Sequence, residues 1–234
     1  MQSATAIEPP AATPRRVAYE VGVSFAVLCV VGATMARIAW LSEYYAVIIA
    51  ALLLYLPSWM RIDSVHCGAV MRPIGRHVAI ALLMAILVLP PFTIGFVGWT
   101  EWVCSQPLLR PLAAGCRGGS LWAQAHFRLP NEFVALCGYH LLVAALPEEF
   151  YFRGFVQGRL AEWLRSPSAA IVLASALFAL CHWIVQGNPA TLAVFFPGLL
   201  FGLLRARTGS ILPGTLFHAL CNIYIETLQR SLFG

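Results

Sequence analysis

The chain has 234 residues, of which 60% are hydrophobic and only 11% are charged. Soluble domains usually carry about 25% charged residues, so this composition excludes an ordinary soluble domain and predicts one membrane-embedded bundle. The formal net charge is +5, but no basic cluster interleaved with aromatic residues marks a nucleic-acid-binding face. We therefore expect the lipid bilayer as the surroundings of the chain and no nucleic acid partner.

Seven apolar stretches predict an all-α, polytopic transmembrane helix bundle of about seven spans, with six to eight as the range. A helix needs roughly 20 residues to cross the hydrocarbon, and continuous apolar runs favour helices over a barrel. The fourth stretch can continue as a helix through a pair of glutamates to Arg165, and the sixth is short enough to be tilted or partly re-entrant. The stretches lie at about 17–40, 44–60, 78–100, 131–147, 168–186, 191–204 and 211–228.

The chain divides into three parts of one domain. Residues 1–16 begin with a run rich in Ala, Pro and Thr, which predicts a disordered cytoplasmic tail and not a signal peptide. Residues 17–130 hold the N-terminal transmembrane helices and a long loop, and residues 131–234 form the catalytic transmembrane core.

All 15 basic residues are arginine, a bias that suggests a GC-rich bacterial genome and hence a bacterial cytoplasmic (inner) membrane. Arginines gather on the cytoplasmic side of multi-pass proteins, so their larger group predicts a cytoplasmic N-terminus. Under a seven-span count that side holds Arg15, Arg16, Arg61, Arg72, Arg76, Arg153, Arg159, Arg165, Arg205 and Arg207.

Two cysteines share the long loop on the opposite side. Cys104 and Cys116 can form a disulfide in an oxidising compartment or remain two unpaired thiols, and the sequence leaves both readings open.

The first polar motif in the apolar C-terminal half is Glu148-Glu149-x-x-x-Arg153. Ionisable residues at membrane depth are rare and usually functional. On a helix Glu149 and Arg153 are four residues apart, so they share a face and can pair, which leaves Glu148 available on another face. Pro147 fits the first turn of a new helical segment or a kink. The alternative is an ion pair that snorkels at a helix end.

Two further motifs lie in later spans, Phe178-x-x-x-His182 and His218-x-x-x-Asn222. His218 and Asn222 stack on one helix face. Each motif alone is also explained by hydrogen bonds between helices.

Together the three motifs suit hydrolysis. A carboxylate held in apolar surroundings binds a proton readily and can act as a general base. A neighbouring histidine can share the proton of a water molecule, and a second histidine with an asparagine can stabilise an oxyanion. No Ser or Cys is placed as an obvious nucleophile.

The ordered set of motifs, each in its own span, resembles the CPBP family of intramembrane proteases, which includes CAAX prenyl endopeptidases and bacterial Abi proteins. The resemblance covers residues 131–228. It implies that Glu148 activates water with the help of His182, that His218 and Asn222 stabilise the oxyanion, and that Glu149 with Arg153 shapes the site.

The resemblance leaves the cofactor open, because family members have been described both as metalloproteases and as glutamic-type proteases. Glu148, His182 and His218 would make a two-His, one-carboxylate zinc site. The sequence lacks the His-Glu-x-x-His helix of the zincins, and Asn is a poor zinc ligand. We favour chemistry without a cofactor and keep zinc as the alternative.

The expected substrate is a membrane-anchored protein or peptide, cleaved near its C-terminus or a membrane-proximal segment. Residues 50–61 (ALLLYLPSWMR within that stretch) resemble bacterial members linked to C-terminal sorting signals. Two other functions compete: a proton-coupled membrane transporter, since buried Glu, His and Arg also form proton relays, and a non-catalytic immunity or partner protein.

Overall fold

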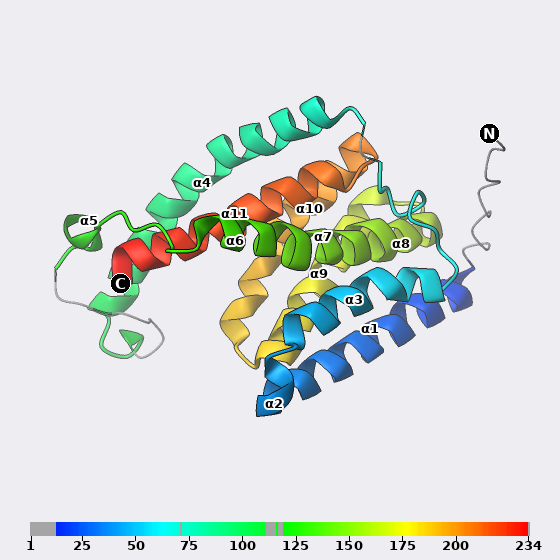
Figure 1. Cartoon of the computed structure of the whole chain (residues 1–234), viewed down its shortest axis with the longest axis horizontal. Coiled ribbons are helices and arrows are strands. Elements are labelled where there is room, and N and C mark those ends of the chain that lie inside the picture. The colour runs from blue at the N-terminus through cyan, green and yellow to red at the C-terminus, as the bar shows by residue number, and fades with distance from the viewer. Residues whose placement is uncertain (1–12, 71, 111–115, 117–118, 234) are drawn as a thin grey trace.

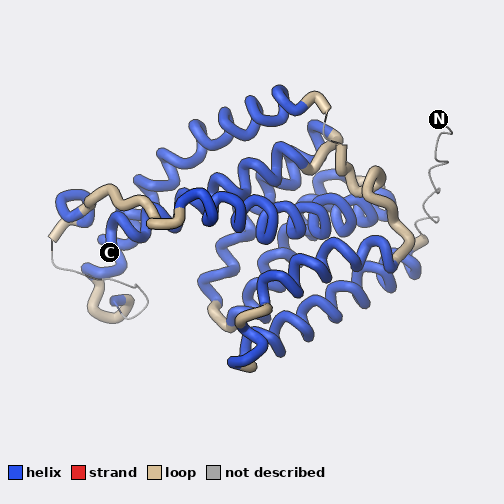
Figure 2. The backbone as a smooth tube through the Cα atoms, viewed as in Figure 1, coloured by secondary structure: helices blue, strands red, loops and turns tan. Residues whose placement is uncertain are grey.

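The structure, a computed structural model, describes residues 13–70, 72–110, 116 and 119–233. These residues form a bundle of helices and include no strand (Figures 1 and 2). The predicted all-α transmembrane helix bundle is therefore confirmed, and the chain is a multi-pass membrane protein. Within the described residues, five helical stretches are long and apolar enough to cross a membrane: Pro14–Arg37 (α1), Ile74–Ser105 (α4), Phe133–Leu164, Pro167–Gln186 (α9) and Pro189–Thr208.

All seven predicted stretches form helices, although two fall outside those five. The helix α3 (Tyr45–Trp59) has 15 residues and reaches only about 22 Å at 1.5 Å per residue. The last helix, α11 (Leu212–Phe233), has 22 residues but carries the polar side chains of the third motif, which lower its hydropathy. The sequence located the helices correctly, and five of the helical stretches are long and apolar enough to span a membrane.

Several predicted boundaries shift, and the third and seventh stretches each run five residues past their predicted ends, to Ser105 and Phe233. The first stretch breaks at Ile38, whose backbone is extended, and the short helix α2 (Ala39–Ser42) follows. The sixth stretch is not short, since a 3₁₀ turn, η4 (Pro189–Val194), leads directly into α10 (Phe195–Thr208). At the N-terminus α1 begins at Pro14, inside the predicted tail of residues 1–16, and residues 1–12 of that tail lie outside the described part of the chain.

The fourth stretch continues as one helix of 32 residues, Phe133–Leu164, through the glutamate pair. Its α-helical parts are separated by two π-helical segments, which flank Pro147 and the glutamates on both sides. Pro147 lies in the first turn of the central α-helical piece, one of the two placements expected for it. π-Helical turns are frequent at functional sites. The pieces in order are α6 (Phe133–Gly138), η2 (Tyr139–Ala145), α7 (Leu146–Glu149), η3 (Phe150–Val156) and α8 (Gln157–Leu164).

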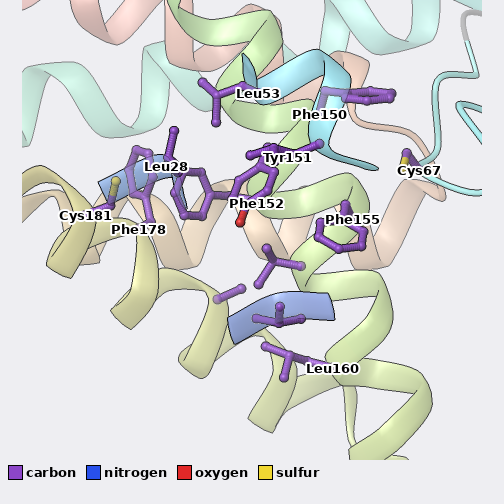
Figure 3. Close-up of a cluster of buried hydrophobic side chains, with 14 of the residues drawn as sticks. Leu28, Leu53, Cys67, Phe150, Tyr151, Phe152, Phe155, Leu160, Phe178 and Cys181 are labelled. Carbon is purple, nitrogen blue, oxygen red and sulfur yellow. The ribbon is translucent and has the colours of Figure 1, made fainter. Parts of the chain in front are cut away.

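Aromatic side chains from the π-helical segment η3 form the centre of the hydrophobic core (Figure 3). Tyr151, Phe152 and Phe155 are almost completely buried and pack with Phe178 of α9 and Leu28 of α1. Burying each large apolar side chain contributes about 1.5–3 kcal/mol. This cluster joins the first, fourth and fifth predicted spans and fixes the helix that carries the glutamate pair.

One end of the bundle collects the N-terminus of α1, the C-termini of α3 and α8, and the start of α4 (Figure 1). Most of the arginines assigned to the cytoplasmic side lie near this end. Arg153 is an exception, because it lies in the middle of the long fourth helix and is fully buried, so it carries no information about orientation.

The far end of α4 carries a disulfide. Cys104 and Cys116 are bonded, which settles the alternative that the sequence left open. The short helix α5 (Leu121–Gln124) follows, and Ser120 and Leu121 both donate hydrogen bonds to Glu101. The disulfide and the arginine-rich end therefore lie at opposite ends of α4.

Candidate active site

The glutamate pair lies at the centre of the fourth span. Glu148 and Glu149 are the 16th and 17th residues of the 32-residue helix Phe133–Leu164. Glu149 is fully buried, whereas the side chain of Glu148 retains 22% of its exposure. The two neighbouring carboxylates therefore have different environments, as their different helix faces predicted.

Glu149 joins two helices. Its Oε2 lies 3.7 Å from Nε of Arg153, the partner that the four-residue spacing predicted. Its Oε1 accepts a hydrogen bond of 3.0 Å from Nδ1 of His218, on α11. Gly214 makes this approach feasible, because a Cβ there would lie 3.2 Å from Oε2 of Glu149.

Arg153 is held mainly by aromatic faces. Its guanidinium lies 4.3 Å from the ring centre of Phe178 and 5.4 Å from that of Phe201, distances typical of cation–π contacts. Nη2 donates a hydrogen bond of 3.3 Å to the carbonyl of Gly198. Nε and Nη1 are buried and have no hydrogen-bond partner among the described residues. A buried arginine with unused donors keeps a strong positive charge beside the glutamates.

His218 lies between the two carboxylates. Since Nδ1 donates to Glu149, the other ring nitrogen, Nε2, faces Glu148, 3.7 Å from its Oε2. The imidazole also stacks on Phe201, with ring centres 4.6 Å apart and an interplanar angle of 14°. Glu149 and Phe201 thus fix the orientation of His218 and aim Nε2 at the exposed carboxylate.

His182 shares a cavity with Glu148. The cavity has a volume of about 150 Å³ and is bounded by helices α1, α3 and α9. The Phe178 carbonyl can only accept, so its hydrogen bond of 2.9 Å places the proton on Nδ1 of His182 and leaves Nε2 free. The lining residues are Leu28, Gly32, Tyr45, Ile49, Leu53, Glu148, Phe152, Cys181, His182, Val185 and Gln186.

The remaining predicted residue, Asn222, lies one turn after His218 on α11 and is half-buried. It makes no hydrogen bond to any described residue and does not line the cavity. The structure thus brings Glu148 together with His182 on one side and with His218 on the other. The role of Asn222 in the site stays a prediction.

The predicted metal-ligand set does not come together in this arrangement. Among the described residues, no group of three or more His, Cys, Asp or Glu side chains is placed to hold a metal ion. Glu148, His182 and His218 therefore do not form a zinc-ligand geometry here, and zinc stays a prediction for experiment.

Several residues of the site were not singled out for it by the sequence. Phe201 contacts both His218 and Arg153, and Gly198 and Gly214 let α10 and α11 approach the charged pair. A Cβ on Gly198 would lie 3.1 Å from Nη2 of Arg153. A glycine or aromatic residue in an apolar helix carries no signal of what it faces, so only the packing reveals these roles.

Comparison with known families bears directly on this site. Residues 130–224 match the model of the family described as type II CAAX prenyl endopeptidase Rce1-like. The match spans 95 of the 234 residues and contains all three polar motifs, from Glu148 to Asn222. The matched segment therefore supports the CPBP family of CAAX-type proteases. Searches of curated proteins and of solved structures found no significant match.

The match to residues 130–224 supports a general class of activity, that of a CAAX-type intramembrane endopeptidase. The matched segment covers the helices that carry the glutamates, both motif histidines and Asn222. The helices α1 and α3, which supply half of the cavity wall beside Glu148, lie outside it.

Proposed function

We propose that this chain hydrolyses a peptide bond inside the membrane with a water molecule that Glu148 activates. The observation that carries the proposal is the position of Glu148. It lies at the centre of a spanning helix, faces a cavity that His182 also lines, and has His218 3.7 Å away on its other side. Glu149 is buried and paired, so Glu148 is the carboxylate with access to water and substrate.

In the proposed reaction, Glu148 takes a proton from a water molecule in the cavity while Nε2 of His182 accepts a hydrogen bond from the same water. The resulting hydroxide attacks the carbonyl carbon of the scissile bond, and the carbonyl oxygen becomes an oxyanion. A protonated Nε2 of His218 and the free amide of Asn222 donate hydrogen bonds to that oxyanion. Glu148 then returns its proton to the leaving amine, and the peptide bond breaks.

Glu149 and Arg153 have a positioning role in this scheme. Glu149 accepts the Nδ1 proton of His218, which orients the ring and favours its positively charged form. Arg153 balances the charge of Glu149 without reaching Glu148, since its ion pair is with Oε2 of Glu149. Charge-balanced neighbours of this kind keep a catalytic histidine in one orientation.

We propose that the substrate is a membrane-anchored protein or peptide cleaved near its C-terminus, such as a C-terminal sorting tail. The stretch 50–61 that resembles sorting-linked members forms the end of α3 and the turn after it, and α3 also lines the cavity beside Glu148. This shared helix supports the narrower proposal.

We further propose a bacterial inner-membrane location with the N-terminus in the cytoplasm. Two chemical markers at opposite ends of α4 support that orientation. Arg72 and Arg76 lie at the start of α4, the pattern of a cytoplasmic side, and the Cys104–Cys116 disulfide at its other end suits an oxidising compartment.

The test is hydrolysis by the purified chain in proteoliposomes of a reporter peptide with an apolar C-terminal membrane anchor. We expect wild-type protein to release a fragment, and Glu148→Gln to be inactive although inserted and folded. The same assay with strong chelators addresses zinc, because full activity after exhaustive chelation supports the metal-free mechanism. Activity lost to the chelator and restored by zinc would instead establish the metal alternative.

A further inference from the structure

A second hollow lies at the arginine-rich end of the bundle, away from the cavity beside Glu148. It has a volume of about 600 Å³ and lies between the start of α1 and the end of α3. Its walls are mainly polar and aromatic side chains near these helix ends. The lining residues are Arg16, Tyr19, Glu20, Trp59, Met60 and Arg61.

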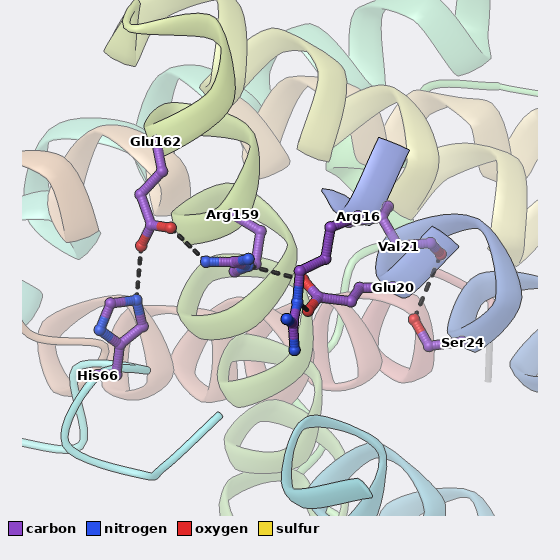
Figure 4. Close-up of polar contacts among 7 residues, drawn as sticks. All are labelled: Arg16, Glu20, Val21, Ser24, His66, Arg159 and Glu162. Carbon is purple, nitrogen blue, oxygen red and sulfur yellow. Dashed lines mark hydrogen bonds and ion pairs between the residues drawn. The ribbon is translucent and has the colours of Figure 1, made fainter. Parts of the chain in front are cut away.

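The charge of this hollow is positive. Glu20 is almost completely buried, and each of its oxygens is already engaged, one by Nε of Arg16 and one by Nε of Arg159, both at 2.8 Å (Figure 4). One carboxylate therefore faces two guanidinium groups. Arg61 adds a third positive charge. Its backbone N–H donates to the carbonyl of Ser58, and its guanidinium makes no hydrogen bond or ion pair with any described residue.

Arg61 also has an unusual backbone conformation. Its φ is +61°, in the left-handed region that favours glycine and is strained for a side chain such as arginine. Strained residues of this kind cluster at ligand-binding positions. At this turn the chain keeps an arginine beside the hollow where a glycine would relieve the strain.

Two aromatic side chains frame the hollow. Tyr19 and Trp59 are 61% and 48% exposed, on the helix ends that border it. Tyr and Trp are enriched at the membrane–water interface, where their rings lie at the level of the lipid head groups. Basic pockets between transmembrane helices bind anionic lipid head groups.

We propose that this hollow is a binding site for an anionic phospholipid. The guanidinium groups of Arg16 and Arg61 bind the phosphate of the head group, and Tyr19 and Trp59 contact the glycerol region. Both arginines can donate paired hydrogen bonds to phosphate oxygens. In a zwitterionic head group the ammonium group offsets the negative charge of the phosphate, so we expect the arginines to bind it less strongly.

The site is linked to the helix that carries Glu148 by two polar contacts of α1. Arg159 of α8 binds Glu20 (Figure 4). Tyr151 of η3 shares a hydrogen bond of 2.8 Å with Ser24 of α1. A lipid that clamps the start of α1 to the end of α3 therefore stabilises the side of the cavity that these helices line. This inference concerns a site separate from catalysis and does not depend on the proposed reaction.

The experiment measures thermal unfolding of the delipidated full-length protein in detergent, titrated with phosphatidylglycerol, with phosphatidylcholine, or with inorganic phosphate. We expect phosphatidylglycerol near saturation to raise Tm by about 5 °C or more, and the other two to change it little. Arg61→Gln should abolish the shift. Arg207→Gln is the matched control, because it removes an exposed arginine of α10 outside the hollow.

A second variant guards against misfolding. Arg61→Gly relieves the positive φ, so the protein should unfold at the same or a higher temperature without lipid, yet lose its response to phosphatidylglycerol. The proposal is overturned if Arg61→Gln and Arg207→Gln reduce the shift equally, if phosphatidylcholine stabilises as well as phosphatidylglycerol, or if inorganic phosphate reproduces the whole effect.

Discussion

Two buried carboxylate–arginine clusters hold this bundle together, and they differ in how completely they are hydrogen-bonded. At the arginine-rich end, both oxygens of Glu20 accept hydrogen bonds from arginines. At the centre, Oε2 of Glu149 and two donor nitrogens of Arg153 are buried without a hydrogen-bond partner among the described residues.

We propose that this difference separates a structural role from a functional one. A buried polar group without a partner costs free energy, so a native fold retains one where it serves a purpose. The cluster at the arginine-rich end, Glu20 with Arg16 and Arg159, joins α1 to α8, and both oxygens of its carboxylate already accept a hydrogen bond. The central cluster, Glu149 with Arg153, has a free acceptor and two free donors among the described residues. They lie next to the proposed position of the reacting water and peptide.

The largest expected effect concerns the central cluster. Glu148→Gln removes the proposed base, so cleavage of a membrane-anchored reporter should fall by about 10²–10⁴-fold. Glu148 makes no hydrogen bond to a described residue, so the unfolding temperature of the Glu148→Gln variant should stay near that of the wild type. Normal turnover by a well-folded Glu148→Gln variant would remove the protease proposal and revive a transporter or non-catalytic role.

The next effect tests the coupling of Glu149 to both partners. Glu149→Gln leaves Arg153 as an uncompensated buried charge, which should lower the free energy of unfolding by about 3–5 kcal/mol. Because Gln does not stabilise a charged His218, kcat should also fall while KM changes less. A loss of stability with unchanged kcat per folded molecule would reduce Glu149 to a purely structural residue.

The matching substitution at the end cluster is Glu20→Gln. It weakens two charged hydrogen bonds, so we expect a loss of about 2–3 kcal/mol in the free energy of unfolding. Activity per folded molecule should remain, as measured with the same reporter after correction for the folded fraction. If Glu20→Gln abolished turnover in fully folded protein, the two clusters would not differ in the way proposed here.

A smaller effect is expected where α1 contacts the helix that carries Glu148. Tyr151→Phe removes the hydrogen bond to Ser24 without changing the shape of the core, which should cost about 1 kcal/mol. Chemical or thermal unfolding measures this loss. Ser24→Ala should cost at least as much, because it also removes the hydrogen bond from Ser24 to the Val21 carbonyl. The double variant should add little to Ser24→Ala, because the interaction with Tyr151 is shared.

The last prediction concerns the loop between α3 and α4, which contains Cys67. Burial raises the pKa of Cys67 to about 12, and its carbonyl oxygen packs against Gly154. At pH 8 only about one molecule in 10⁴ carries the reactive thiolate. Maleimide labelling of Cys67 should therefore be negligible in native protein and complete after unfolding, as read by mass spectrometry. Rapid native labelling would show that this loop opens.

The sequence predicted helices well because apolar runs are a local signal. The fourth stretch was correctly expected to continue through the glutamates, and the spacing of Glu149 and Arg153 predicted their ion pair. Its π-helical segments were not predicted, since they depend on packing around Pro147. The roles of Glu148, His182, His218 and Asn222 came from motif order and family resemblance, and they remain proposals.

The contact between Glu149 and His218 could not be predicted from helical periodicity. The two residues are 69 positions apart, and spacing reports only which side chains share a face of one helix. Whether α11 turns His218 towards Glu148, Glu149 or neither depends on Gly214 and on stacking against Phe201. Small residues and aromatic rings thus decided a polar geometry that the motifs alone left open.

The π-helical segment Phe150–Val156 connects Glu149 to Arg159 along one continuous helix, with Glu149 just before it and Arg159 shortly after it. Removing one residue there would rotate every later side chain by roughly 100° relative to the glutamates. Arg159 would then turn away from α1 while Glu148 kept its place. Insertions and deletions in this segment should therefore be tolerated far less than substitutions, and a designed homologue must preserve its length before its composition.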